Sequence, residues 1–298
     1  MEKEFLVYIN GEYFPKSQAK VTVFDHGLLY GDGVFEGIRA YSGVVFKLRE
    51  HIDRLYQSAH AIMLEIPMSK DEMIQAILET LKRNNLREAY IRPVVTRGPG
   101  DLGLDPRNCQ DPTIIIITET LTLHNVEVKE KGARTIITWV RRDSIDATSH
   151  EIKSLNYLNS ILARIEANNA EVDEAICLDK YGFVCEGSVE NLFIMSDGTI
   201  FTPPTFIGVL PGITRKRIIK LLKELGYEVI ERNISTTELF AADEVFFTGT
   251  AAEIVPVVEI SKRKIGNGLP GPITKQIMQE FEIIKRDPKE GIPIEFQS

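Results

Sequence analysis

Lys153 stands at a predicted corner between a strand and a helix, where a lysine amine can do covalent chemistry. The β-branched run at residues 134–140 predicts the strand, and the apolar spacing after the lysine predicts a helix with a buried face. The apolar residues of that face are Leu155, Leu158, Ile161, Leu162 and Ile165. Partial desolvation at such a corner disfavours the ammonium form and lowers the pKa of a lysine. The neutral amine can then attack a carbonyl carbon. Lys153 is therefore a candidate nucleophile, with an ordinary solvated lysine as the alternative.

Two carboxylates, Glu186 and Glu190, lie in the segment 185–192, just before a predicted strand. A carboxylate beside a pyridine nitrogen keeps that nitrogen protonated, and the pyridinium then draws electrons from a bound substrate. Either glutamate suits this role. A surface or turn position is the alternative for each of them.

Three segments suit a phosphate group. Gly212 precedes a predicted helix whose first free N–H groups belong to Ile213 and Thr214, and such a helix end binds anions. The segment 247–253 has small residues that let the backbone approach an anion, and Thr250 adds a hydroxyl. Arg54 offers a guanidinium fork on a predicted helix. A plain helix start, a tight turn and a solvated arginine are the respective alternatives.

The first half of the chain predicts a small α+β domain over residues 1–120. Asn10-Gly11 and Ser42-Gly43 each separate two apolar runs and predict β-hairpins. Residues 50–63 have helical spacing, and Ser69 with Glu72 forms a capping box for a second helix. Further buried strands are expected at residues 89–96 and 113–118.

A polar and charged stretch at residues 121–132 reads as an interdomain connection. The remainder, residues 133–298, predicts a large domain of strands and helices that binds a cofactor. Gly226 is expected just beyond the end of an amphipathic helix at residues 213–225. Ser235 and Glu238 form another capping box, and residues 273–284 predict the last helix.

Composition excludes several classes of protein. The 298 residues carry a net charge of -8, which argues against nucleic-acid or anionic-membrane partners. No apolar run approaches the ~20 residues that span a bilayer. The first residues do not resemble a signal peptide, and the three cysteines are interpreted as reduced thiols, so a cytoplasmic location is expected. Five scattered histidines and the cysteine spacing predict no metal site.

Seven segments recur together in the order of a known family. They are Phe35-Glu-Gly-Ile-Arg39, His51-x-x-Arg54-Leu55, Tyr90-Ile-Arg-Pro93, Lys153-x-x-Asn156-Tyr157, Glu186-Gly-x-x-Glu-Asn191, Leu210-Pro-Gly-Ile-Thr214 and Gly249-Thr-Ala-Ala-Glu253. Together they resemble the fold-type IV, class IV aminotransferases that use pyridoxal 5′-phosphate, over about residues 5 to 260. Within that superfamily, the segments that contain Phe35 and Tyr90 are similar to those of the branched-chain amino-acid aminotransferases.

The resemblance implies a mixed α/β (α+β), D-amino-acid aminotransferase-like fold of two domains, with the cofactor at the domain interface. It implies that Lys153 holds the cofactor as an internal aldimine and that the freed amine moves the substrate proton. Glu186 would pair with the pyridine nitrogen, and Tyr157 would hydrogen-bond the phenolic oxygen of the ring. The remaining implied cofactor contacts are Leu210 on the ring and Arg54, Ile213, Thr214 and Thr250 on the phosphate.

On the substrate side, the resemblance places Tyr30, Phe35 and Tyr90 around an apolar cavity. Arg92 and the Tyr30 hydroxyl would receive the γ-carboxylate of glutamate. The substrate α-carboxylate would sit on the amides of Thr250 and Ala251, near the Tyr90 hydroxyl. The loop 98–106 is expected to cross to a partner subunit, with Leu102 and Leu104 near the neighbouring site, which implies a homodimer or a higher homo-oligomer.

The implied activity is a ping-pong transfer of the amino group from L-leucine, L-isoleucine or L-valine to 2-oxoglutarate. A D-amino-acid or (R)-amine transaminase and an aminodeoxychorismate lyase are the alternatives. Two departures from the family pattern bear on substrate range. Only Ser154 and Leu155 separate Lys153 from Asn156, and Val189 stands where some members carry glycine.

Overall fold

The computed structural model describes residues 4–120 and 126–296, which divide into two units. The first unit comprises Met1–Leu121, Ile152–Asn156 and Ile283–Ser298, and the second comprises Thr122–Glu151 and Tyr157–Glu282. The division expected from the sequence differs from these bounds. Residues 152–156 and 283–298 belong with the first unit, because they pair with its strands: β17 joins β5, and residue 154 bridges to residue 34. The predicted connection 121–132 lies partly outside the described residues.

An eight-stranded sheet forms the first unit, and its pairings are antiparallel. The strand order is β17-β5-β4-β6-β7-β1-β2, and β3 also pairs with β6. The bounds are β1 Leu6–Ile9, β2 Glu12–Pro15, β3 Gly33–Phe35, β4 Ile38–Tyr41, β5 Val44–Phe46, β6 Ala89–Thr96, β7 Thr113–Glu119 and β17 Gly291–Pro293.

Both predicted hairpins of the first unit are confirmed. Asn10 and Gly11 join β1 to β2 with φ values of 46° and 96°, and Ser42 and Gly43 join β4 to β5 with 50° and 84°. Positive φ at both central positions is the geometry whose twist matches that of the flanking strands. The turn residues therefore set the strand register without help from distant contacts.

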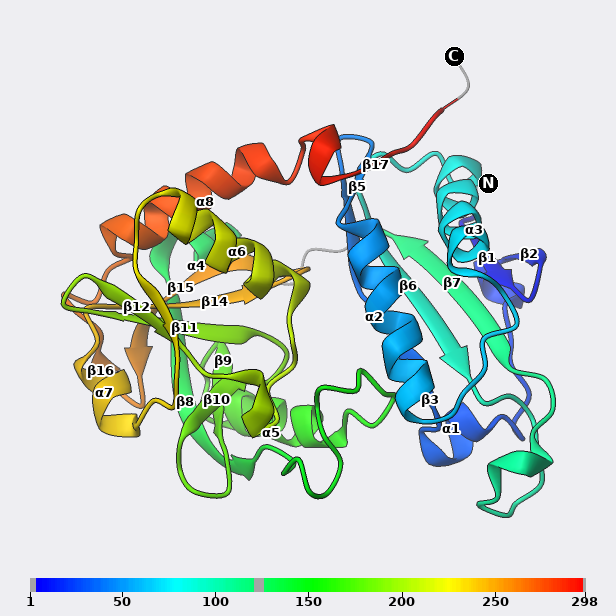
Figure 1. The fold of residues 1–298 in the computed structure, drawn as a ribbon, viewed down its shortest axis with the longest axis horizontal. Helices are drawn as coiled ribbons and strands as arrows, with labels where there is room; N and C mark the ends of the chain where they lie inside the picture. The colour runs from blue at the N-terminus through cyan, green and yellow to red at the C-terminus, as the bar shows by residue number, and fades with distance from the viewer. Residues whose placement is uncertain (1–3, 121–125, 297–298) are drawn as a thin grey trace. The chain divides into compact units, whose positions relative to one another are not determined.

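Helices α2 (Leu48–Ala61) and α3 (Lys70–Arg83) pack against this sheet, and α1 (His26–Tyr30) is a short helix that follows an Asp25 cap. Figure 1 shows α2 and α3 in blue and cyan beside the strands. The predicted Ser69–Glu72 capping box is present at the start of α3. The apolar stripes of both helices share one core with the inward side chains of the strands.

A nine-stranded mixed sheet forms the second unit, in the order β10-β9-β8-β15-β14-β11-β12-β13, with β16 on β15. Because β10 also pairs with β11, the strands from β10 to β11 close into a barrel. The bounds are β8 Ala133–Arg141, β9 Glu174–Leu178, β10 Val184–Gly187, β11 Asn191–Ser196, β12 Thr199–Thr202, β13 Val229–Glu231, β14 Glu244–Gly249, β15 Glu253–Ile260 and β16 Arg263–Lys264.

The helices of the second unit are α4 Val126–Lys131, α5 Leu158–Asn169, α6 Ile213–Glu224, α7 Thr236–Ala241 and α8 Pro272–Ile284, although the last two residues of α8 are assigned to the first unit. The predicted Ser235–Glu238 capping box starts α7, and Gly226 follows α6 at a φ of 87°. The stretch predicted as a polar connection contains α4, whose Val128 packs against the core of this unit. Within the described residues, no helix has the length and apolar character to span a membrane.

The prediction that α5 buries its large aliphatic residues is wrong. The helix turns Ser160, Ala163 and Ala167 inward, and the two alanines pack with Val140 of β8. Small side chains let the helix axis come close to the sheet, and the larger residues then point outward. Leu158, Ile161, Leu162 and Ile165 are 65%, 53%, 39% and 48% exposed. We call these four residues the α5 stripe.

Candidate active site

Main-chain hydrogen bonds hold Lys153 on both sides in the first unit. Its carbonyl accepts from the amide of Phe35 at 3.1 Å, and its own amide donates to Oγ of Ser58 at 3.1 Å. The next residues continue the pairing, since Leu155 donates to the carbonyl of Gly33 at 2.9 Å. The lysine is therefore positioned by the edge of β3 and by α2, and a change of its side chain leaves these bonds in place.

The ring of Phe35 has two cations beside it. Nζ of Lys153 lies 4.4 Å from the ring centroid, and Cζ of Arg92 lies 4.6 Å from it. Arg92 also donates to the hydroxyl of Tyr90 at 2.6 Å. Tyr90 and Arg92 are two residues apart on β6, so their side chains leave the same face of the sheet. The structure thus brings together four of the residues predicted from the sequence.

Arg54 is buried in an ion-pair cluster that the sequence did not reveal. Its Nε and Nη2 lie 2.7 and 2.8 Å from the two carboxylate oxygens of Glu36, and Nδ1 of His51 lies 2.8 Å from the same group. Burial raises the pKa of Glu36, but Arg54 and His51 outweigh it and hold that pKa well below its usual value. Glu36 thereby orients the Arg54 guanidinium.

The break between β3 and β4 places Glu36 in this cluster. The apolar run before Ser42-Gly43 covers residues 34–41, but it does not form one strand, because the chain leaves the sheet at Glu36 and Gly37. A Cβ at Gly37 would lie 2.2 Å from the Tyr90 hydroxyl, so only glycine allows this approach. The break between β3 and β4 therefore affects two predicted site residues: it brings Glu36 to Arg54, and it lets the Tyr90 hydroxyl approach the backbone at Gly37.

Tyr30 lies at the end of α1, where its hydroxyl donates to the carbonyl of Leu102 at 2.6 Å. A ring nitrogen of His26 lies 2.8 Å from the carbonyl of Asp101. These contacts tie the loop 98–106 to α1 of its own unit. Leu102 and Leu104 at the tip of the loop are 70% and 78% exposed.

In the second unit, Glu186 is the centre of a buried polar network. Its carboxylate lies 3.1 Å from Nε of Arg142 and accepts from Nδ2 of Asn191 at 3.0 Å and from the amide of Leu210 at 3.2 Å. A guanidinium beside a carboxylate favours the charged form of the carboxylate. Burial opposes the charge of Arg142, but the carboxylate of Glu186 and smaller contributions from neighbouring groups together raise the pKa of Arg142.

Arg142 connects this carboxylate to two other parts of the site. It donates to the carbonyls of Gly187 and Ser188 at 2.6 and 3.2 Å, in the turn that follows Glu186. It also donates to Asn159 and Ser160 at 2.9 and 3.2 Å, in the first turn of α5. Tyr157 immediately precedes this turn as the N-cap residue of α5. One buried side chain thus links Glu186 to the helix that Tyr157 begins.

The turn before α6 is shaped by Asn191. Its Nδ2 donates to the carbonyl of Leu210 at 2.9 Å, and its Oδ1 would lie 2.0 Å from a Cβ at Gly212. Gly212 is the N-cap residue of α6, and no side chain of the residues that the structure describes caps this helix end. The first amides of α6, at Ile213 and Thr214, are therefore suited to an anion.

Thr250 and Ala251 form the tip of the hairpin between β14 and β15. The last strand pair before this tip is Gly249 with Glu253. Ala252 is buried in the core, whereas Thr250 and Ala251 are half-buried. The tip therefore has a fixed base and presents two accessible residues with small side chains.

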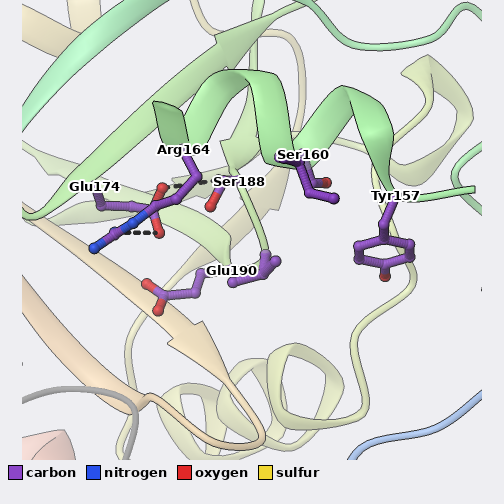
Figure 2. Close-up of a pocket in the computed structure, with 8 residues that line it drawn as sticks. Tyr157, Ser160, Arg164, Glu174, Ser188 and Glu190 are labelled. Atoms are coloured by element: carbon purple, nitrogen blue, oxygen red, sulfur yellow. Dashed lines mark hydrogen bonds and ion pairs between the residues drawn. The ribbon is translucent and has the colours of Figure 1, made fainter. Parts of the chain in front are cut away.

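A cavity of about 320 Å³ adjoins Tyr157 and Glu190 (Figure 2). It lies beside α5 and the turn at Ser188, and its further lining residues are Ser160, Ile161, Arg164, Glu174 and Val189. Burial, and then the nearby charge of Glu190, raise the pKa of Glu174. Among the residues predicted for the site, Tyr157 and Glu190 line this cavity.

Comparisons with known proteins agree with these observations. The family model described as amino-transferase class IV matches residues 33–260. A protein of Methanocaldococcus jannaschii, whose branched-chain-amino-acid aminotransferase name is provisional, is 56% identical over 94% of this chain and 96% of its own. The crystal structure of Escherichia coli branched-chain amino acid aminotransferase is 40% identical, with a TM-score of 0.92 over 94% of each chain. The Thermobaculum terrenum enzyme of the same name, solved in its PLP-form, is 30% identical, with a TM-score of 0.89 over 99% of this chain and 100% of its own.

Proposed function

Since this chain belongs to the class IV aminotransferase family, we propose that it transfers amino groups between branched-chain L-amino acids and 2-oxoglutarate by a ping-pong mechanism with pyridoxal 5′-phosphate. The relatives named above support the substrate class and the cofactor. The observation that carries the proposal is the Glu186 network. It supplies a buried carboxylate, with a guanidinium beside it, suited to a pyridine nitrogen.

The described residues fit this cofactor. The uncapped start of α6 and the glycine at 212 suit a phosphate. We propose that Lys153 carries the cofactor and that Tyr157, Glu186 and Leu210 contact its ring. The proposed phosphate contacts are Arg54, Ile213, Thr214 and Thr250. When bound, the cofactor supplies a protonated ring that accepts the electron pair of the substrate Cα–H bond.

The chain itself contributes proton transfer and orientation. Lys153 supplies an amine that removes the Cα proton of the substrate and later returns a proton. Arg142 favours the charged form of Glu186 and holds the first turn of α5, so that Tyr157 keeps its place. Glu36 fixes the fork of Arg54 in a planar, two-point contact.

For the substrate, we propose that Tyr30, Phe35 and Tyr90 line an apolar cavity and that Arg92 receives the γ-carboxylate of glutamate. The amides of Thr250 and Ala251 would hold the α-carboxylate. The position of the Arg92 guanidinium beside Phe35 supports this arrangement, because one place then offers both an aromatic surface and a positive charge. The aromatic surface suits the apolar side chain of leucine, and the positive charge suits the γ-carboxylate of glutamate.

A half-reaction screen tests the proposed function. The purified holoenzyme is mixed separately with L-leucine, L-glutamate, D-alanine and an (R)-amine, and the absorption band of the bound cofactor is followed. Loss of the band with L-leucine and L-glutamate is expected. Loss with D-alanine or the (R)-amine alone would instead support a D-amino-acid or (R)-amine transaminase, and no loss with any donor would contradict transamination.

Replacement of Arg92 by alanine is expected to slow the glutamate half-reaction roughly 100-fold, because a buried carboxylate then lacks its cation. The leucine half-reaction should change less than about fivefold, since an apolar side chain needs no such partner. Single-turnover rates measure both. Arg87→Ala is the matched control, because Arg87 also stacks on an aromatic ring, that of Phe296, 4.3 Å away. Equal losses in the two half-reactions of Arg92→Ala would contradict dual recognition.

We propose that the protein is a homodimer or a higher homo-oligomer, with Leu102 and Leu104 near the neighbouring site. The α5 stripe supports self-association. Its spacing reads the same in both directions, so two antiparallel copies would place Leu158 against Ile165 and Ile161 against Leu162. Such a self-complementary face is what a two-fold interface requires.

The double substitution Ile161→Asp and Leu162→Asp is therefore expected to lower the molar mass to that of a smaller species, because two buried charges would oppose the contact. Sedimentation velocity at several protein concentrations measures the change. Met63→Asp is the control, since Met63 is 87% exposed in the other unit. An unchanged mass for the double variant would exclude the α5 stripe as the interface.

We also propose a cytoplasmic location. Cys109, Cys177 and Cys185 are not joined in disulfides. Unpaired thiols are typical of a reducing compartment. The net charge of -8 and the fit to amino acids and 2-oxo acids support small molecules as the ligands, with neither nucleic acid nor membrane as a partner.

A further inference from the structure

Lys129 and Glu253 form an ion pair at the base of the hairpin that carries Thr250 and Ala251. Nζ of Lys129 lies 2.8 Å from Oε2 of Glu253. The two side chains are 26% and 10% exposed, so the pair is shielded from solvent more than a surface pair is. Neither residue belongs to the proposed site.

Glu253 has a backbone conformation that usually belongs to glycine. It is the first residue of β15, with a φ of 65°. Three-residue hairpin loops commonly place a left-handed residue at this point, and glycine adopts it without strain. A glutamate at this position is more strained than a glycine would be. Its presence therefore indicates that the carboxylate makes an interaction that offsets the strain.

Lys129 is held on a rigid support. Helix α4 ends at Lys131, and a Cβ on the following residue, Gly132, would lie 2.2 Å from a methyl carbon of Val258 on β15. The chain then enters β8, whose Ala133 pairs with Val257. The helix is therefore fixed to the strand that begins at Glu253, and its lysine reaches the start of the same strand.

We propose that Lys129 and Glu253 are positioning residues for the anion-binding tip of this hairpin. The ion pair holds Glu253 in its left-handed conformation and so orients the amides of Thr250 and Ala251. Lys129 also offsets a carboxylate that would otherwise repel the cofactor phosphate and the substrate α-carboxylate. The inference rests on the proposed function, which assigns those two anions to the hairpin tip.

The test uses Lys129→Met in the full-length protein, with Lys131→Met as the matched control. Lys131 lies on the same helix and pairs with the exposed Glu127, one turn away. Isothermal titration of the apoenzyme with inorganic phosphate and with pyridoxal 5′-phosphate gives both affinities. Lys129→Met is expected to weaken each on the order of tenfold, about the size of the losses seen when residues that orient metal ligands are replaced. Lys131→Met should leave both unchanged.

Steady-state kinetics adds a second readout. In Lys129→Met saturated with cofactor, KM for L-leucine and L-glutamate should rise while kcat changes little, because the hairpin binds the carboxylate in both ground and transition states. Glu253→Gln, which keeps the shape and can still accept from Lys129, should have a smaller effect, and it carries the test if Lys129→Met does not fold. Equal affinities for Lys129→Met and Lys131→Met would overturn the inference. A wild-type protein that neither binds the cofactor nor transaminates would instead contradict the proposed function.

Discussion

Replacement of Lys153 by alanine is expected to stop transamination, with a loss of at least about 10³-fold in turnover, because the covalent attachment and the proton-transferring amine disappear together. The fold should persist. The main-chain bonds of residue 153 to Phe35 and Ser58 do not depend on the side chain, which is only half-buried. The expected change in unfolding free energy is within about 1 kcal/mol.

Three measurements check the Lys153 prediction: single-turnover rates with L-leucine, borohydride trapping followed by peptide mapping, and thermal unfolding. Lys180→Ala is the matched control, since its amine also lies near an aromatic ring, 5.4 Å from the centroid of Tyr181, and pairs with Asp146. The control should keep wild-type activity. Turnover by Lys153→Ala at the wild-type rate, or trapping at another lysine, would refute the assignment of Lys153.

The second large effect is expected at Arg142, which the sequence did not single out. Arg142→Met should reduce the unfolding free energy by about 3–5 kcal/mol, the usual cost of leaving one member of a buried ion pair alone. The uncompensated group is Glu186, and the carbonyls of Gly187 and Ser188 also lose their donor. Cofactor affinity should fall as well, because Glu186 and the start of α5 lose their common support.

Urea unfolding and cofactor titration measure these two effects. Arg141→Met is a close control: its guanidinium is exposed and donates to the carbonyls of Thr138 and Trp139 in its own strand. Arg142→Lys keeps the positive charge but loses the several N–H donors of the guanidinium. Compared with Arg142→Met, it should restore part of the cofactor affinity and a smaller part of the unfolding free energy. If Arg142→Met is no less stable than Arg141→Met, the buried network has no structural importance.

Local signals in the sequence predicted several turns and helix ends. The hairpins at Asn10-Gly11 and Ser42-Gly43, both capping boxes and the end of α6 at Gly226 all lie where the sequence placed them. Each depends on the conformational preference of a residue or on a bond to a neighbour three positions away. Such preferences operate before any tertiary contact exists.

These local preferences could not predict which face of α5 is buried. Helical spacing identified a stripe of large aliphatic residues, and burial is the usual reason for such a stripe. The barrel of the second unit instead accepts the small face at Ala163 and Ala167, because a close approach to β8 excludes larger side chains. Periodicity tells which residues share a face, but the shape of the neighbouring surface decides which face is covered.

The sequence by itself determined the order of the candidate groups: an amine at 153, a carboxylate at 186, and turns at 212–214 and 250–251 that we propose bind anions. Local backbone preference made them candidates, and the resemblance of the seven ordered segments to a known family implied their roles. Only the tertiary structure decided that Glu36 orients Arg54, that Arg142 supports Glu186, and that Lys129 braces Glu253. These partners are far apart along the chain, and a buried charge accepts whichever opposite charge the packing brings within hydrogen-bond distance.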